Sequence, residues 1–268
     1  MEAYIVPDRT IPKGQANKHI VMLARNKQGY QNLLKLHYEA YKSGASQVYD
    51  RIVPRMDHTM FTRDACKGII ATTACLVSEV AQHLIELDSA PDDWEENFDE
   101  AERIIKLYKQ TFDGVFAEIQ PDHFLIGHDP DSGPSKALQV EYNDKLRFLA
   151  KKLELPLTVA TDSHYLTAEE REAHHLILAI QSKKNMNDPE RFCFESTPML
   201  TTEQLLSRNF GDTALDESVV KNTTKIADAC EYPDYLSFQG YRLPKFPIPQ
   251  SDEYKKWLKT SGGLLDEV

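Results

Sequence analysis

The segment Gly68-Ile69-Ile70-Ala71-Thr72-Thr73-Ala74-Cys75 decides the fold class. Its apolar run over residues 68–72 is short and follows a glycine, which is typical of a β-strand. The next residues, 76–87, favour a helix, so a strand leads directly into a helix. This arrangement indicates an α/β fold.

Similar apolar runs recur on both sides of this segment and alternate with helical periodicity. Five strands separated by helices indicate a largely parallel α/β sheet or barrel rather than an antiparallel sandwich. The first strand starts at Glu2, which leaves no room for a pairing neighbour before it, so we expect an uncovered strand at a sheet edge. The first strand is predicted to end at residue 6, and the other strands are predicted at residues 19–25, 115–119 and 157–161. Helices are predicted at residues 28–41, 94–108 and 135–153.

The chain changes character after about residue 200. Thr201-Thr202-Glu203 is typical of a helix start, and residues 216–230 have the period of an amphipathic helix. The proline-rich segment 243–249 suits neither a helix interior nor a central strand, so we expect an extended connector. The sequence therefore predicts an α/β unit over residues 1–200 and a helical extension with this connector over residues 201–268.

Composition limits the classes of partner. The 268 residues carry 31 Lys and Arg against 42 Asp and Glu, a formal net charge of −11, which argues against a broad basic surface for nucleic acid. No apolar stretch approaches the roughly 18 residues of a membrane span, and the first residues do not resemble a secretory signal. We therefore expect a cytoplasmic protein with no membrane partner. The four cysteines form no C-x-x-C pair, which argues against a disulfide framework and a zinc knuckle.

Working residues of α/β folds collect at the ends of strands, and several candidates lie there in this sequence. Asp162 and His164 follow the strand at 157–161. Because they are two residues apart in a turning segment, both side chains could face a common site. The alternative is that Asp162 caps the next helix and His164 lies on the surface. Cys75 follows the strand at 68–72, although a free cysteine is more often a small buried apolar residue than a ligand.

Glu2 and His19 each open a strand. Taken alone, each is more often a solvated polar residue than a ligand. His174 and His175 are adjacent on a helix predicted after Ala168, and because adjacent residues do not share a helix face, we interpret this pair as structural.

Several segments, taken in order, carry a more specific pattern. They are EAYIV at residues 2–6, HIVMLARN at 19–26 with GYQNL at 29–33, GIIATTACL at 68–76 and ATDSHYL at 160–166. These resemble successive motifs of the PHP (polymerase and histidinol phosphatase) domain of bacterial DNA polymerase III α subunits. Residues 180–192 and the proline-rich segment 243–249 also resemble that family, where its PHP domain runs toward the polymerase palm.

The resemblance implies a distorted seven-stranded α/β barrel whose strand ends hold up to three divalent metals through nine ligand positions. Five positions match here: Glu2, His19, Cys75, Asp162 and His164. In the family the glutamate bridges two metals, and the positions of His19 and Cys75 complete one of these. The position of Asp162 belongs to the other bridged metal, and that of His164 to a third. A thiolate with imidazole and carboxylate suits zinc, with manganese, iron or magnesium as alternatives.

The family's remaining ligands, an H-x-H motif with a following Asp and His, precede the glutamate strand. We therefore expect a partial barrel that lacks four ligands and two strands. The palm with its catalytic aspartates would lie beyond Val268, so nucleotidyl transfer is not expected from this chain.

Two functions remain open. The first is the PHP portion of a replicative polymerase subunit, with metal-dependent phosphoesterase or 3′-to-5′ exonuclease activity when the remaining α-subunit segments or a complementing N-terminal polypeptide are supplied. DNA would then be approached indirectly or through bound metals. The second is an inactive, metal-stabilised scaffold that binds polymerase or proofreading partners. An independent small-molecule phosphoesterase has less support, because H-x-H is missing.

Overall fold

The computed structural model describes residues 1–48, 51–85, 94–121, 125–126, 134–188, 191, 194–195, 198–208, 210–211, 214–231 and 251–260. The chain divides into two compact units, Met1–Pro233 and Asp234–Val268. In the second unit the structure describes helix α8 (Asp252–Thr260). The predicted connector at 243–249 lies outside the described residues, and the predicted boundary near residue 200 stays a prediction.

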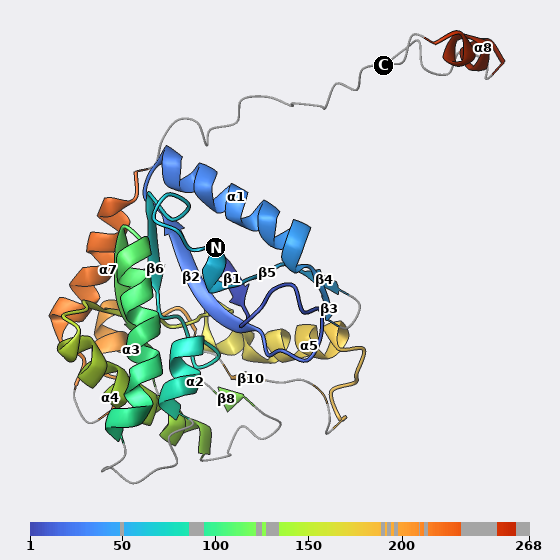
Figure 1. Ribbon diagram of the computed structural model, residues 1–268. Coiled ribbons are helices and arrows are strands. Elements are labelled where there is room, and N and C mark those ends of the chain that lie inside the picture. Colours follow the sequence, from blue (N-terminus) through green and yellow to red (C-terminus); the bar gives the residue numbers. More distant parts are fainter. Residues whose placement is uncertain are drawn as a thin grey trace. The chain divides into compact units, whose positions relative to one another are not determined.

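A six-stranded mixed sheet organises the first unit (Figure 1). All five predicted strands are present, and a two-residue strand joins them at one edge. The strand order is β5 (Arg55–Met56), β1 (Glu2–Ile5), β2 (Lys18–Ala24), β6 (Ile69–Thr72), β7 (Gly114–Ile119) and β9 (Leu157–Val159). The mixed α/β class is confirmed. A closed barrel is not confirmed, because among the described strands no pairing joins β5 to β9.

Three of the five described pairings in this sheet are parallel, as predicted, whereas β2 runs antiparallel to both β1 and β6. The expectation that β1 is an uncovered edge was wrong, because β1 pairs with β2 on one side and, in parallel, with β5 on the other. The partner β5 contributes only two residues, too short a run to show any periodicity in the sequence.

Two small antiparallel ribbons lie outside the main sheet. Strands β3 (Ser46–Val48) and β4 (Arg51–Val53) form one ribbon, and β8 (Leu125–Ile126) and β10 (Phe194–Glu195) form the other. Neither was predicted, since two or three residues carry no pattern.

The first unit contains α1 (Lys27–Gly44), α2 (Glu79–Ile85), α3 (Trp94–Thr111), α4 (Pro134–Lys152), α5 (Arg171–Gln181), α6 (Thr202–Leu206) and α7 (Glu217–Ala229), with short 3-10 turns at His58–Met60 and Ala168–Glu170. The sequence predicts helices at the places of α1, α3, α4, α5, α6 and α7 but not at that of α8, and side-chain caps define several starts. Asn26 accepts a hydrogen bond from the backbone N–H of Gly29 at 3.0 Å. Thr201 forms a capping box with Gln204, and α6 starts where the segment Thr201-Thr202-Glu203 predicts a helix. None of the helices in the described ranges is long and apolar enough to cross a membrane.

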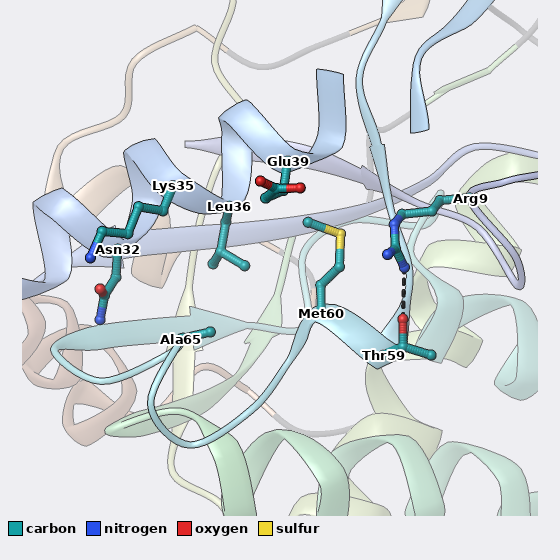
Figure 2. Close-up of a pocket in the computed structure, with 8 residues that line it drawn as sticks. All are labelled: Arg9, Asn32, Lys35, Leu36, Glu39, Thr59, Met60 and Ala65. Carbon is teal, nitrogen blue, oxygen red and sulfur yellow. Dashed lines mark hydrogen bonds between the residues drawn. The ribbon is translucent and has the colours of Figure 1, made fainter. Parts of the chain in front are cut away.

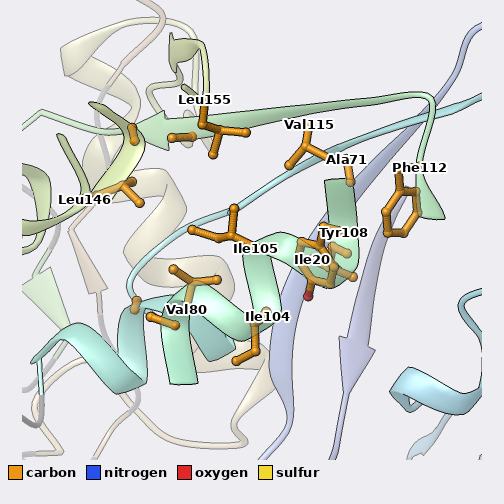
Figure 3. Packing of buried hydrophobic residues seen from close by; sticks show 14 of the residues in the cluster. Ile20, Ala71, Val80, Ile104, Ile105, Tyr108, Phe112, Val115, Leu146 and Leu155 are labelled. Carbon is orange, nitrogen blue, oxygen red and sulfur yellow. The ribbon is translucent and has the colours of Figure 1, made fainter. Parts of the chain in front are cut away.

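The core lies on one face of the sheet. Side chains alternate between the two faces of a strand, and the register aligns Met22 with Ala71 and Ala71 with Val115. These three side chains are buried, and helix α3 covers their neighbourhood with Ile104 and Ile105 (Figure 3). Fully burying a large aliphatic side chain contributes about 1.5–3 kcal/mol, so this face supplies much of the driving force for folding.

A close backbone approach fixes α1 against the start of β6. A Cβ added to Gly29 would stand 1.8 Å from the carbonyl oxygen of Gly68. Gly68 itself has φ +77°, a conformation that L side chains rarely adopt. Both positions therefore require glycine.

Candidate functional site

The face of the sheet opposite the core is polar where β1, β2, β6 and β7 meet. The register aligns Glu2 with Val21, and Val21 with Thr72. His19 lies two residues before Val21, and so on the same face. Glu118 of β7 lies two residues beyond Phe116, the partner of Thr72. The sheet therefore separates an apolar core face from a polar face that carries candidate residues.

Three predicted site residues are in direct contact. The Nδ1 atom of His19 lies 2.9 Å from Oε1 of Glu2 and 3.4 Å from Sγ of Cys75. The side chain of Glu2 is about half exposed, whereas Cys75 is buried. The structure thus brings together a carboxylate, an imidazole and a thiol from three separate segments.

Electrostatics supports close coupling within this trio. Burial disfavours the charged imidazole, yet the hydrogen bonds with Cys75 and Glu2 outweigh it and raise the pKa of His19 to about 10. The hydrogen bond with His19 lowers the pKa of Glu2, and the nearby His164 lowers it further. At neutral pH the arrangement favours a protonated imidazole beside an ionised carboxylate.

A tight turn presents Cys75. The preceding Ala74 has φ +55°, a left-handed conformation unusual for a residue other than glycine. The N–H of Ser78 donates to the carbonyl of Cys75 at 2.9 Å, and the Ser78 hydroxyl accepts from Ala81 at 3.1 Å. Because these residues form a turn, α2 begins at Glu79 rather than at residue 76 as predicted.

Asp162 and His164 follow β9 in a second tight turn. Asp162 has φ +48°, and its carbonyl oxygen lies 2.7 Å from Nδ1 of His164. Burial raises the pKa of the Asp162 carboxyl; the His164 charge opposes this rise, and the Glu2 charge adds to it. These mutual influences place both residues within electrostatic reach of the trio. The cap of the next helical turn is Thr167, so the alternative role of Asp162 as a helix cap is wrong.

The donor set has the chemistry of a zinc site, but its geometry here is that of hydrogen-bonded side chains. Cys, His and Asp or Glu are the usual zinc ligands. In the described ranges, however, no group of three or more His, Cys, Asp or Glu side chains is arranged to hold a metal ion. The Nδ1 atom of His19 lies between Glu2 and Cys75 as their shared partner. The ligand roles of all five residues therefore stay predictions.

The polar face also contains a residue that the sequence reasoning missed. Glu118 is 6% exposed, and its carboxylate accepts hydrogen bonds from the hydroxyl of Thr72 at 2.6 Å and from the amide of Gln120 at 3.0 Å. Burial raises the pKa of Glu118, and the charges of Asp162 and Glu2 raise it further. The available signal was an acidic residue inside the otherwise apolar strand GVFAEI.

A second buried polar cluster lies at the start of α2. Both carboxylate oxygens of Glu79 lie 2.9 Å from Nε2 of His58, and the carboxylate accepts a hydrogen bond from the hydroxyl of Tyr108. Burial and the adjacent Glu79 raise the pKa of Tyr108 well above its ordinary value, so the phenol remains a donor. This cluster joins α2, α3 and the turn after β5.

A cavity of about 220 Å³ lies beneath α1, separate from the candidate residues (Figure 2). Its polar wall includes Arg9, whose guanidinium donates to Thr59 at 2.7 Å and pairs with Asp57 at 2.7 Å. Arg9 is therefore engaged in holding its own loop. The cavity shares no residue with the five predicted ligands.

Part of the chain is similar to a known protein family. Residues 1–122, a little under half of the chain, match the family model described as "PHP domain". The matched range contains Glu2, His19 and Cys75, and it ends before Asp162 and His164.

The chain is also similar to DNA polymerase III subunit alpha from several bacteria. It is 32% identical to the Thermus aquaticus protein over 257 residues, covering 92% of this chain and 18% of the relative. It is 32% identical to the Deinococcus radiodurans protein over 261 residues, covering 93% and 18%. The Saccharopolyspora erythraea protein is 33% identical over 233 residues, covering 86% and 17%. The chain spans about a fifth of the length of these curated relatives.

Proposed function

We propose that this chain is the PHP portion of a bacterial-type DNA polymerase III α subunit, acts in DNA replication, and binds a divalent metal on the polar face of its sheet. The contact between Glu2, His19 and Cys75 carries the metal proposal, because chain segments far apart in sequence deliver three zinc-type donors to one point. The similarity over about nine tenths of the chain supports the polymerase assignment.

Glu2, His19 and Cys75 would hold the first metal, zinc being favoured over manganese, iron or magnesium by the thiol. Asp162 and His164 would add donors from the turn after β9. Metal binding by Glu2, His19 and Cys75 requires a change from the hydrogen-bonded arrangement, because His19 must give up the Nδ1 proton that it shares with Glu2. A bound divalent cation supplies Lewis acidity and an activated water, the requirements for phosphodiester hydrolysis.

We propose as partners the remaining α-subunit segments or a complementing N-terminal polypeptide, together with DNA. The net charge of −11 disfavours direct capture of phosphates over a broad surface. Bound cations at the polar face would provide local positive charge.

The second candidate function is an inactive, metal-stabilised scaffold for polymerase or proofreading partners. It is favoured by one observation: Glu2, His19 and Cys75 come from three separate segments, so a metal bound to them would cross-link the folded unit. A scaffold needs the folded unit but no turnover.

The test starts with the purified chain. Elemental analysis should find bound zinc that is lost in His19→Ala and Cys75→Ser but retained in His37→Ala, a matched change at an exposed histidine of α1. Absence of metal at neutral pH with added zinc would overturn the metal proposal.

The degradation of 3′-labelled single-stranded DNA then separates the two functions. Activity that requires metal and disappears in Asp162→Ala supports the phosphoesterase. Activity that appears only with an added polypeptide carrying H-x-H supports complementation. Stoichiometric metal without degradation under either condition supports the scaffold.

A further inference from the structure

We propose that Glu118 is a positioning residue that holds the thiol of Cys75 against His19. This inference deepens the proposed metal site and rests on it only for the second of two measurements below. Neither the sequence motifs nor the family match assigns a role to this residue.

The first step is the position of the carboxylate. Glu118 is 6% exposed, and a buried carboxylate is costly unless donors compensate for its lost water. Its partners are the hydroxyl of Thr72 at 2.6 Å and the side-chain amide of Gln120 at 3.0 Å. Thr72 and Gln120 are themselves buried, so the group is enclosed by protein.

The second step runs from Thr72 to the Cys75 turn. While its hydroxyl donates to Glu118, the same oxygen accepts the backbone N–H of Ala74 at 3.2 Å. Ala74 is the residue held at φ +55°, a conformation that needs support from its surroundings. The hydrogen bond from Ala74 supplies that support immediately before Cys75.

A parallel connection fixes the other side of the turn. The backbone N–H of Glu118 donates to the hydroxyl of Thr73 at 2.9 Å, and the N–H of Thr73 donates to the carbonyl of Phe116 at 3.1 Å. Strand β7 therefore clamps residues 72–74 through both the side chain and the backbone of Glu118. The clamped turn ends at the thiol, 3.4 Å from Nδ1 of His19.

The first measurement uses metal-free protein, so it does not depend on metal binding. The rate of iodoacetamide modification is followed at Cys75 by mass spectrometry, and the fully buried Cys66 reports global opening as an internal control. Glu118→Ala and Thr72→Val should raise the Cys75 rate at least about tenfold, since each removes a link of the clamp and a buried thiol reacts only when its turn opens.

Two conservative variants provide the matched controls. Thr72→Ser keeps the hydroxyl and should stay within about twofold of the wild type. Glu118→Gln keeps an acceptor for Thr72, and the Oε1 atom of Gln120, which has no hydrogen-bond partner among the described residues, can turn to receive the new amide. Unchanged Cys75 rates in both disruptive variants, or a parallel rise at Cys66, would overturn the positioning role.

The second measurement is the thiolate-to-metal charge-transfer absorption of the cobalt-loaded protein. It should weaken in Glu118→Ala and persist in Glu118→Gln, because only the former releases the thiol. Equal bands in both variants contradict the inference. Failure of the wild type to bind cobalt counts against the metal proposal, and the alkylation result then decides the positioning role alone.

Discussion

Replacing Tyr108 by phenylalanine tests the buried cluster that anchors the start of α2. The change removes one hydroxyl, the donor to the carboxylate of Glu79, while the ring can keep its edge contact with Phe112 at a centroid distance of 5.6 Å. The carboxylate then retains His58 as its partner. Because the substitution leaves the ring in place, the lost hydrogen bond dominates the energy change.

The expected magnitude follows from the charge of the acceptor. A hydrogen bond to a charged group contributes about 1.5–3 kcal/mol, so Tyr108→Phe should lower the free energy of unfolding by about 2 kcal/mol. For a unit of this size, that loss corresponds to a fall in Tm of about 4–8 °C.

Urea unfolding at pH 7, followed by circular dichroism, measures the difference. Tyr38→Phe is the matched control, because Tyr38 is 64% exposed on α1 and its change should stay within about 0.5 kcal/mol. Equal midpoints for the two variants at equal m-values would refute the assignment of Tyr108 as a donor to a buried carboxylate.

Three further predictions concern backbone and side-chain environments. Gly29→Ala should lower the free energy of unfolding by about 3 kcal/mol or more, because the new Cβ would meet the carbonyl of Gly68. Gly14→Ala, at φ +81° with nothing within 4 Å, should lower it by about 1–2 kcal/mol. Similar urea midpoints for the two variants would contradict the close approach. The pairing of His19 should stabilise the metal-free protein fully below pH 6.5 and lose this effect as the pH rises through about 10, because the pKa of His19 is higher in the folded than in the unfolded protein. The same pH profile of unfolding in a His19→Asn variant would exclude this contribution. Burial raises the pKa of Cys66 to about 12, so at pH 8 iodoacetamide should modify it about a thousandfold more slowly than free cysteine in the native protein, and fast labelling would disprove its burial.

The long elements of the fold were predictable from local pattern. Apolar runs located β1, β2, β6, β7 and β9 to within about two residues at each end, and helical spacing located α1, α3 and α4. Strand direction was not predictable in the same way. The antiparallel course of β2 depends on which strands meet in space, and the two-residue β5 covers the edge of β1 without any sequence signal.

The donor residues of the candidate site were predictable from the sequence, whereas the residues that hold these donors in place were not. Polar residues next to strand ends are visible in the sequence, which is why Cys75 and Asp162 were found. Glu118 lies within a strand, and its importance depends on pairing that aligns β7 with β6. The left-handed turn at Ala74 also has no sequence marker, because glycine is absent there and the N–H of Ala74 is held instead by the hydroxyl of Thr72.

The spread of the candidate residues along the chain has a consequence for biosynthesis. Glu2 and His19 leave the ribosome before Asp162 and belong to a strand pair that can form locally, whereas Asp162 requires β9 to join β7. At a synthesis rate of about 5–20 residues per second, roughly 8–30 seconds separate the two ends of the site. During this interval a nascent chain exposes a thiol and an imidazole without their full surroundings, so a metal encountered early would meet an incomplete set of donors.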